Sequence, residues 1–112
     1  MRDLVRFKLL TGRLFRRPSF GELTYVDDWP ESFRSGCVYL QEAQNGPWSL
    51  AFVCPCGCEE VIYLNLLPQS RPCWSMNVTW FGGVSIIPSV WRKRGCLSHF
   101  FLRDGNVVWA KD

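Results

Sequence analysis

The sequence lacks any apolar run of the length that a membrane span needs, which is about 20 residues. Charged residues at positions 2, 3 and 6 also interrupt the start of the chain, where a secretory signal would carry an uninterrupted apolar stretch. These absences argue against a membrane protein and against a secreted one. We therefore expect a cytoplasmic protein without a membrane partner, in which thiols stay reduced.

Helical periodicity, internal repeats and low-complexity segments are missing as well. Short apolar runs are instead separated by turn residues, among them Asn45-Gly46 and Asp104-Gly105, which favour hairpins. About eight strands at a spacing of about 8–12 residues are predicted. They cover residues 4–10, 36–41, 47–54, 61–67, 73–81, 84–91, 97–103 and 107–110. The fold class predicted from this pattern is mainly β, a small antiparallel sandwich or barrel.

Length and charge indicate one domain over residues 1–112, since 47% of the residues are hydrophobic and the net charge is only +3. Charge is unevenly spread, with a basic segment at residues 1–17 followed by an acidic middle. Arg13, Arg16 and Arg17 could contact nucleic acid. The alternative is that the basic segment pairs with the acidic middle. We favour this alternative and expect no nucleic-acid partner.

Cysteine, by contrast, is abundant and clustered. Cys54, Cys56 and Cys58 form the run Cys-Pro-Cys-Gly-Cys, and Cys73 and Cys96 follow. In a reducing compartment such clustering favours a metal over disulfides. Thiolates gathered by a tight turn suit tetrahedral zinc. We therefore expect one zinc ion that staples the fold.

The zinc ligand set stays open at the level of sequence. Cys54, Cys56 and Cys58 are all candidate ligands, but three cysteines spaced two apart cannot all be assumed to bind, because sterics usually let two of them chelate. Cys73 and Cys96 would then complete a four-sulfur site, or His99 would replace one sulfur. Cys37 is expected to be a small buried hydrophobe instead of a ligand. A closed site would only staple the fold, whereas a catalytic zinc would need an open coordination position.

Two serines are candidate nucleophiles because they lie near the only histidine, His99. Ser98 is its direct neighbour, but neighbours on a strand point to opposite faces, so proton transfer between them is awkward. Ser89 could face His99 across a pair of strands, which is the better geometry for a Ser–His couple. The alternative is that both serines are ordinary turn hydroxyls and that His99 binds zinc.

Four motifs carry a resemblance to a known family. They are Phe52–Cys58 (FVCPCGC), Arg71–Trp74 (RPCW), Pro88–Arg92 (PSVWR) and Gly95–Phe101 (GCLSHFF). In this order they resemble the peptidase component of Bub-type (bacterial ubiquitination-like) operons. Such operons also encode a ubiquitin-like protein and its activating and conjugating enzymes. The resemblance covers the chain from about residue 50 to its C terminus.

This resemblance implies a zinc-dependent serine peptidase that processes or deconjugates a ubiquitin-like protein. The implied partners are that protein and its activating and conjugating enzymes. Cysteines of the first, second and fourth motifs would hold zinc, and Ser89, Ser98 and His99 are the candidates for catalysis, with Ser89 the preferred nucleophile. The rival interpretation is a zinc-binding adaptor module without catalysis in the same kind of pathway.

Overall fold

The structure is a computed structural model that describes residues 20–44, 46–79 and 83–110. The strand predicted at residues 4–10 lies outside the described residues. So does the basic segment at residues 1–17, which includes Arg13, Arg16 and Arg17. The remaining seven predicted strands all fall on strands of the structure, although their ends differ by a few residues.

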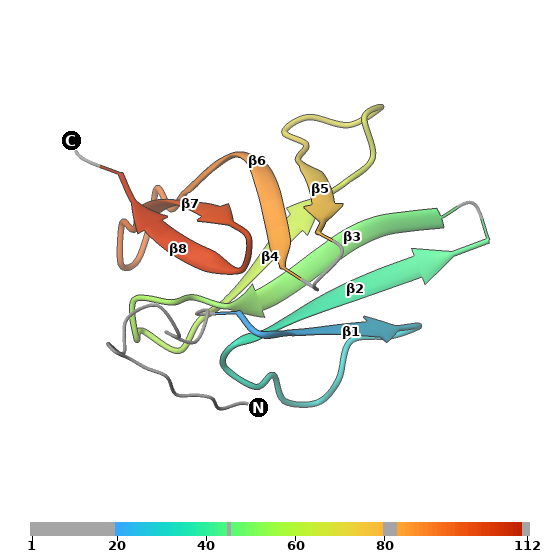
Figure 1. Ribbon diagram of the computed structural model, residues 1–112, viewed down its shortest axis with the longest axis horizontal. Helices are drawn as coiled ribbons and strands as arrows, with labels where there is room; N and C mark the ends of the chain where they lie inside the picture. Colours follow the sequence, from blue (N-terminus) through green and yellow to red (C-terminus); the bar gives the residue numbers. More distant parts are fainter. Residues whose placement is uncertain (1–19, 45, 80–82, 111–112) are drawn as a thin grey trace.

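Within the described residues, eight strands form two four-stranded sheets (Figure 1). The first sheet contains, in spatial order, β1 (Glu22–Val26), β2 (Cys37–Ala43), β3 (Gly46–Val53) and β4 (Val61–Asn65). The second contains β5 (Ser75–Val78), β6 (Val84–Trp91), β7 (His99–Arg103) and β8 (Asn106–Trp109). No helix occurs among the described residues, and so none that could cross a membrane. The predicted mainly β fold is confirmed.

Strand β1 escaped the sequence analysis, and it also departs from the predicted antiparallel order. It pairs with β2 in parallel, with Glu22 opposite Cys37 and Val26 opposite Gln41, whereas the other pairs in both sheets are antiparallel. The loop of residues 27–36 runs from the end of β1 back to the edge of the sheet where β1 starts, so that β2 can run parallel to it (Figure 1). A strand of five residues that is nowhere fully buried has little periodic signal.

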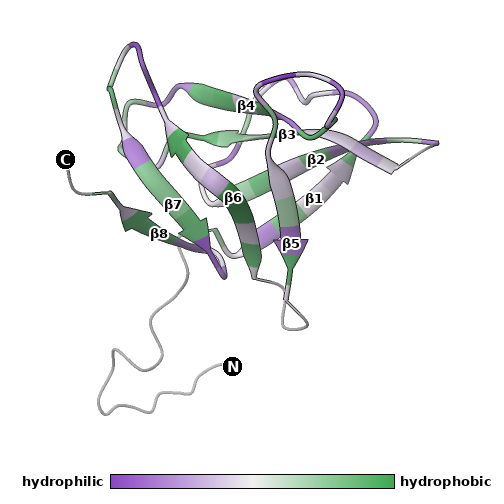
Figure 2. Ribbon diagram, turned by 90° about the horizontal axis from the view of Figure 1, so that it is seen from above, coloured by the Kyte–Doolittle hydropathy of each residue, from purple (hydrophilic) through white to green (hydrophobic). Residues whose placement is uncertain are grey.

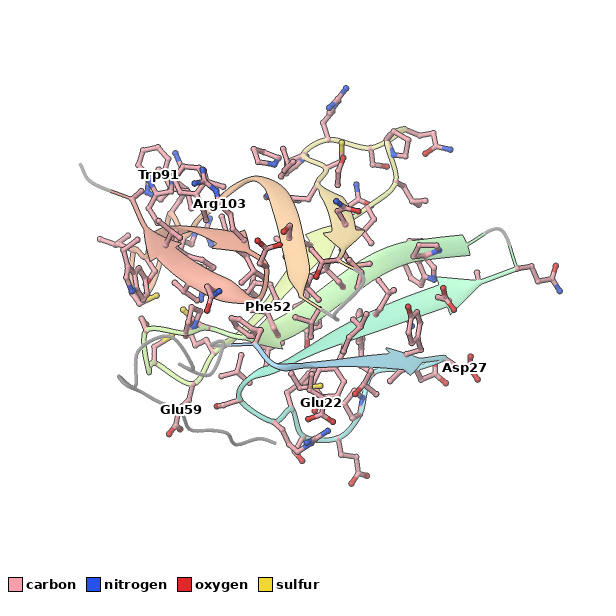
Figure 3. All side chains as sticks on the ribbon, in the orientation of Figure 1. Glu22, Asp27, Phe52, Glu59, Trp91 and Arg103 are labelled. Carbon is pink, nitrogen blue, oxygen red and sulfur yellow. The ribbon has the colours of Figure 1, made fainter. Side chains whose placement is uncertain are left out.

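Aromatic side chains join the two sheets. Phe52 of β3 is fully buried, and its ring centroid lies 5.1 Å from that of Phe20 and 6.2 Å from that of Phe100 in β7. Both contacts are edge-to-face, an arrangement that the ring quadrupole favours. Figure 3 shows Phe52 between the sheets, and Figure 2 shows hydrophobic residues recurring along β6 and β7. The core also includes Val38, Leu40, Leu50, Leu64, Val84, Ile86, Val90 and Leu102.

The predicted hairpin between β7 and β8 is present, with a turn of two residues instead of the three, 104–106, that lie between the predicted strands. Arg103 pairs with Asn106, and the two residues between them, Asp104 and Gly105, have φ angles of 51° and 80°. Two successive positive φ angles are the signature of a type I′ turn, which Asp-Gly favours. The N–H of Gly105 donates to the carbonyl of Val84 at 2.8 Å, so the hairpin is also tied to β6.

A bulge interrupts the ladder between β6 and β7. Ile86 pairs with Leu102 and Val90 with Phe100, so residues 87–89 of β6 oppose a single residue of β7. Extra residues on one strand bend it and re-aim its side chains, and such bulges are frequent next to active sites. The last residue of this bulge is the serine that the sequence analysis prefers as nucleophile.

Truncating the central phenylalanine tests this core. We expect Phe52→Ala to lower the free energy of unfolding by about 3–5 kcal/mol, because it leaves a cavity between the sheets. Val108→Ala, at a side chain that is 42% exposed, should change it by no more than about 0.5 kcal/mol. Urea unfolding of the two variants measures both values. A larger loss for Val108→Ala than for Phe52→Ala would contradict this account of the core.

Candidate functional site

Two loops from different sheets bring four cysteines together. Cys54, Cys56 and Cys58 come from the loop between β3 and β4, and Cys96 comes from the loop between β6 and β7. All four Sγ atoms lie within 4.8 Å of one another. We call this group the four-cysteine cluster. It connects the first sheet to the second.

The β3–β4 loop turns its three cysteines toward one point. The N–H of Cys54 donates to the carbonyl of Glu60 at 2.8 Å, which closes the loop at its base. Gly57 has a φ of +99°, a conformation that is easily reached only without a Cβ, and it reverses the chain between Cys56 and Cys58. From the sequence alone, the three cysteines are candidate ligands that cannot all be assumed to bind. The structure brings all three together because of this reversal.

The spacing of the sulfurs suits a tetrahedral metal ion. Bonds of about 2.3 Å from zinc to sulfur place tetrahedral ligands about 3.8 Å apart. The Sγ atom of Cys54 lies 3.5 Å from that of Cys56 and 3.7 Å from that of Cys96. These distances are far longer than the bond of about 2.05 Å in a disulfide, and all six cysteines carry free thiols. The cluster can therefore hold one metal ion.

The surroundings of the cluster separate the acidities of its thiols. Burial raises the pKa of Cys54 to about 12, because a low-dielectric environment disfavours the thiolate. The hydrogen bond with the Ser98 hydroxyl lowers the pKa of Cys96 to about 6, because it stabilises the thiolate. A metal cation bound at this point favours the thiolate form of every ligand.

Arg92 joins the same two loops beside the cluster. Its guanidinium donates to the Glu60 carboxylate at 2.6 Å, and its backbone N–H donates to the carbonyl of Ser98 at 2.7 Å. The hydrogen bond to Glu60 raises the pKa of Arg92, and the charge of Cys96 adds to this shift. A fixed positive charge next to sulfur ligands offsets part of the negative charge that they bring.

Cys73 and Cys37 lie outside the four-cysteine cluster. Cys73, in the segment before β5, accepts a hydrogen bond from the Arg71 guanidinium at a distance of 3.3 Å from N to Sγ. Cys37 is fully buried in β2, with its Sγ 3.2 Å from the hydroxyl of Thr24. Cys73 is a candidate ligand from the sequence, because it could complete a four-sulfur site and belongs to the second motif. Spacing does not encode the direction of a loop, and the structure does not bring this residue to the others.

Ser89 and His99 meet across β6 and β7. The Oγ atom of Ser89 lies 2.9 Å from Nε2 of His99, the distance needed for proton transfer within a Ser–His couple. Trp91 stands directly opposite His99 in the ladder, and its ring stacks on the imidazole with centroids 4.6 Å apart and planes at 9°. The arrangement can turn a serine hydroxyl into a nucleophile, with the imidazole as its base.

The hydroxyl of Ser98 contacts sulfurs of the four-cysteine cluster and not the imidazole of His99. Its Oγ lies 3.1 Å from Sγ of Cys96 and 4.0 Å from Sγ of Cys54. His99, the next residue and the first of β7, contacts Ser89 instead and is not part of the four-cysteine cluster. The two candidate serines thus occupy different places, one at the sulfur cluster and the other at the imidazole.

A row of stacked side chains on the outer face of the second sheet holds the imidazole of His99. Lys93 Nζ lies 3.7 Å from the Trp91 ring centroid on one side. On the other side the Phe101 ring lies 6.2 Å from the imidazole, and the Arg103 guanidinium lies 4.8 Å from the Phe101 centroid. Figure 3 shows Trp91 and Arg103 on this outer side. The row restricts rotation of the imidazole and leaves a positive charge at each end.

A cleft of about 640 Å³ lies beside Ser89 along β6 and β7. Ile87, Pro88 and Phe101 supply apolar walls, and Arg103 lies among its polar residues. The cleft therefore adjoins the contact between Ser89 and His99.

A family model described as bacterial ubiquitination-like system serine protease (BubE) matches residues 25–110. The chain belongs to the BubE family. The matched region contains all four clustered cysteines together with Ser89 and His99. Comparison with curated proteins and with solved structures gives no significant match. The resemblance inferred from the motifs is confirmed, and the match extends it toward the N terminus.

Trp91 and Arg92 are site residues of this BubE-family chain that sequence reasoning did not single out. Both follow Ser89 in the Pro88–Arg92 motif, so a signal was present. Residues two apart on a strand share a face, which places Trp91 on the side of Ser89. Its contact with His99 depends on the register between β6 and β7. That register is set by the bulge at residues 87–89, which has no recognisable signal in the sequence.

Cysteine substitutions test the composition of the cluster. We expect about one metal ion per chain of the BubE-family protein, since four sulfurs complete one tetrahedral site. Cys54→Ser and Cys96→Ser should each remove more than half of the metal, whereas Cys73→Ser and Cys37→Ser should retain it. Elemental analysis of the purified variants measures this. Loss of the metal in Cys73→Ser together with its retention in Cys96→Ser would contradict the site.

Proposed function

We propose that this protein is a zinc-dependent serine peptidase that processes or deconjugates a bacterial ubiquitin-like protein. The contact of 2.9 Å between Ser89 and His99 carries the proposal, within a family described as serine proteases of a ubiquitination-like system. Its partners would be the ubiquitin-like protein and the activating and conjugating enzymes of that pathway. Six free thiols fit a reducing compartment, which supports a place in the cytoplasm.

Ser89 is the proposed nucleophile and His99 the general base. Nε2 of His99 accepts the hydroxyl proton as Oγ of Ser89 attacks the scissile carbonyl carbon. The imidazolium then gives this proton to the leaving group as the substrate bond breaks, which leaves an acyl-serine. Water attacks the acyl carbon of the acyl-serine while His99 takes a proton from the water. The imidazolium then gives this proton to Oγ of Ser89 as the acyl–oxygen bond breaks, which releases the acid and restores the hydroxyl.

Trp91 acts in this mechanism as a positioning residue. Its ring covers one face of the imidazole at 4.6 Å, so the plane of His99 stays directed at Ser89. Phe101 limits rotation from the other side, with its ring 6.2 Å away. An imidazole that is held in this way needs little reorganisation before it takes the proton.

Zinc is proposed to bind at the four-cysteine cluster as a structural ion. Cys54, Cys56, Cys58 and Cys96 would fill all four tetrahedral positions, and a site closed by protein ligands holds the fold together instead of activating water. When bound, zinc supplies a rigid link between the β3–β4 and β6–β7 loops. The separation of His99 from the cluster supports its role as a base, one of the two roles that the sequence left open.

Removing the nucleophile or the base tests the dyad. We expect Ser89→Ala and His99→Ala each to reduce cleavage of a ubiquitin-like protein fused to a C-terminal fluorescent protein by about 10³-fold or more. Zinc content and thermal stability should be retained, because neither side chain belongs to the sulfur cluster. Gel-based cleavage assays and elemental analysis measure the two quantities.

Ser98→Ala is the matched control for this test. It removes a hydrogen bond to Cys96, so it should weaken zinc binding while the zinc-loaded protein keeps its cleavage rate within about tenfold. Loss of cleavage in zinc-loaded Ser98→Ala would contradict the assignment of Ser89. A wild-type protein that binds the fusion without cleaving it would support the adaptor interpretation instead.

A further inference from the structure

A second groove lies between β4 and the end of β6. Its volume is about 380 Å³, and its walls include residues 61–64, Trp74 and residues 90–94. Strand β4 is the last strand of the first sheet, and β5 pairs with β6 only as far as Ile87. Each wall is therefore a strand without a strand partner on the groove side among the described residues. We call this space the β4–β6 groove.

The backbone groups of β4 that face the groove follow from the hydrogen bonds to β3. The carbonyl of Glu60 accepts from the N–H of Cys54, so Glu60 faces β3. In an antiparallel ladder, residues that face the partner strand alternate with residues that face away from it. Ile62 therefore faces β3, and the N–H and C=O groups of Val61 and Tyr63 point outward to the groove side.

The opposite wall repeats this pattern. The N–H of Arg92 donates to the carbonyl of Ser98, so Arg92 faces β7 and the backbone of Trp91 faces away from it. Ser89 lies two residues earlier, and its carbonyl accepts a hydrogen bond from Nε1 of Trp74, a groove residue, at 3.2 Å. The wall of the groove is thus continuous with the residue that carries the proposed nucleophile.

Basic side chains dominate one rim of the groove. Arg92 pairs with Glu60, whereas Lys93 lies over the Trp91 ring and Arg94 is exposed. In the described parts of the chain, no carboxylate forms an ion pair with Lys93 or Arg94. A partner strand with acidic side chains would complement this rim and would be steered to it.

We propose that the β4–β6 groove binds an extended acidic segment of the substrate protein as an added strand. The proposal rests on the proposed function and names the place where its substrate docks. The added strand pairs with the outward backbone groups of Val61 and Tyr63, while Lys93 and Arg94 contact its carboxylates. Strand addition takes its affinity from such main-chain hydrogen bonds. The shared wall then directs the adjoining part of the substrate toward Ser89.

Hydrogen exchange distinguishes this arrangement from any other docking mode. The Ser89→Ala protein is mixed with the uncleaved fusion of a ubiquitin-like protein and a fluorescent protein, and amide exchange is followed by NMR. We expect exchange at Val61 and Tyr63 to slow by about tenfold or more, because both amides gain a hydrogen bond. The amide of Ile62, which is already bonded to β3, serves as the internal control and should change by less than about twofold.

The outcomes separate this inference from the proposed function. If exchange at Val61 and Tyr63 is unchanged while the wild-type protein cleaves the fusion, the docking site is overturned and the proposed peptidase function is retained. Slowed exchange at both amides without wild-type cleavage supports the docking site and overturns the peptidase. Unchanged exchange without cleavage overturns both.

A proline at an outward position provides a second test. Val61→Pro removes an N–H that β3 does not use, and proline is tolerated where an edge strand faces outward. In the Ser89→Ala background, Val61→Pro should weaken binding of the fusion about fivefold relative to Val61→Ala, as expected for a lost main-chain hydrogen bond. Fluorescence anisotropy gives the Kd values, and zinc content reports correct folding. Equal Kd values for two folded variants would overturn the proposal.

The charge of the rim is tested in the same background. Arg94→Glu should weaken binding by about threefold or more relative to Arg94→Ala, with the difference reduced in high salt. This variant leaves β4 untouched, so it remains informative if the proline variant does not fold. Binding that is equal or tighter in Arg94→Glu would overturn the acidic nature of the docked segment.

Discussion

The approach of Cys96 to the sulfurs of the β3–β4 loop is the constraint on which the rest of the site depends. It joins loops that belong to different sheets, and its Sγ lies 3.7 Å from that of Cys54. Cys96 precedes His99, the first residue of β7, by three residues. Contacts that fix the position of the Cys96 sulfur therefore also restrict the position of the start of β7. Arg92 and Glu60 bridge the same loops at 2.6 Å. The four-cysteine cluster thereby links the β3–β4 loop to the loop that leads into His99.

The bulge in β6 supplies the other half of the geometry. It lets the Ser89 hydroxyl reach His99, although Trp91 is the residue that stands directly opposite the histidine in the ladder. Trp91 then serves as a stacking surface for the imidazole. In this way a small β-sandwich places its candidate chemistry on the face of a sheet, where the register of two strands sets the distances. The apolar core around Phe52 keeps the two sheets, and hence the loops, in place.

Sequence reasoning reached the features that depend on local signals. Asp104-Gly105 predicted the hairpin in which it lies. Ser98 and His99 have separate contacts, as expected, although Ser98 precedes β7 and the alternation of side chains along a strand therefore does not explain it. It did not find β1, which is short and half-exposed, and it could not tell which of the five candidate cysteines would come together, so that Cys73 was named with the others although it lies apart from them. Those features depend on loop direction and on strand register, which arise only when distant segments pack together.

The most direct test of the account is labelling with a fluorophosphonate, a probe that reacts with activated serines, followed by mass spectrometry of the modified peptides. The account predicts one adduct, on Ser89, which forms in the zinc-loaded protein. Its formation should slow strongly in His99→Ala and after zinc is removed, because each change disturbs the base or its position. An adduct on Ser98, or labelling of Ser89 at an undiminished rate in His99→Ala, would contradict the Ser89–His99 dyad.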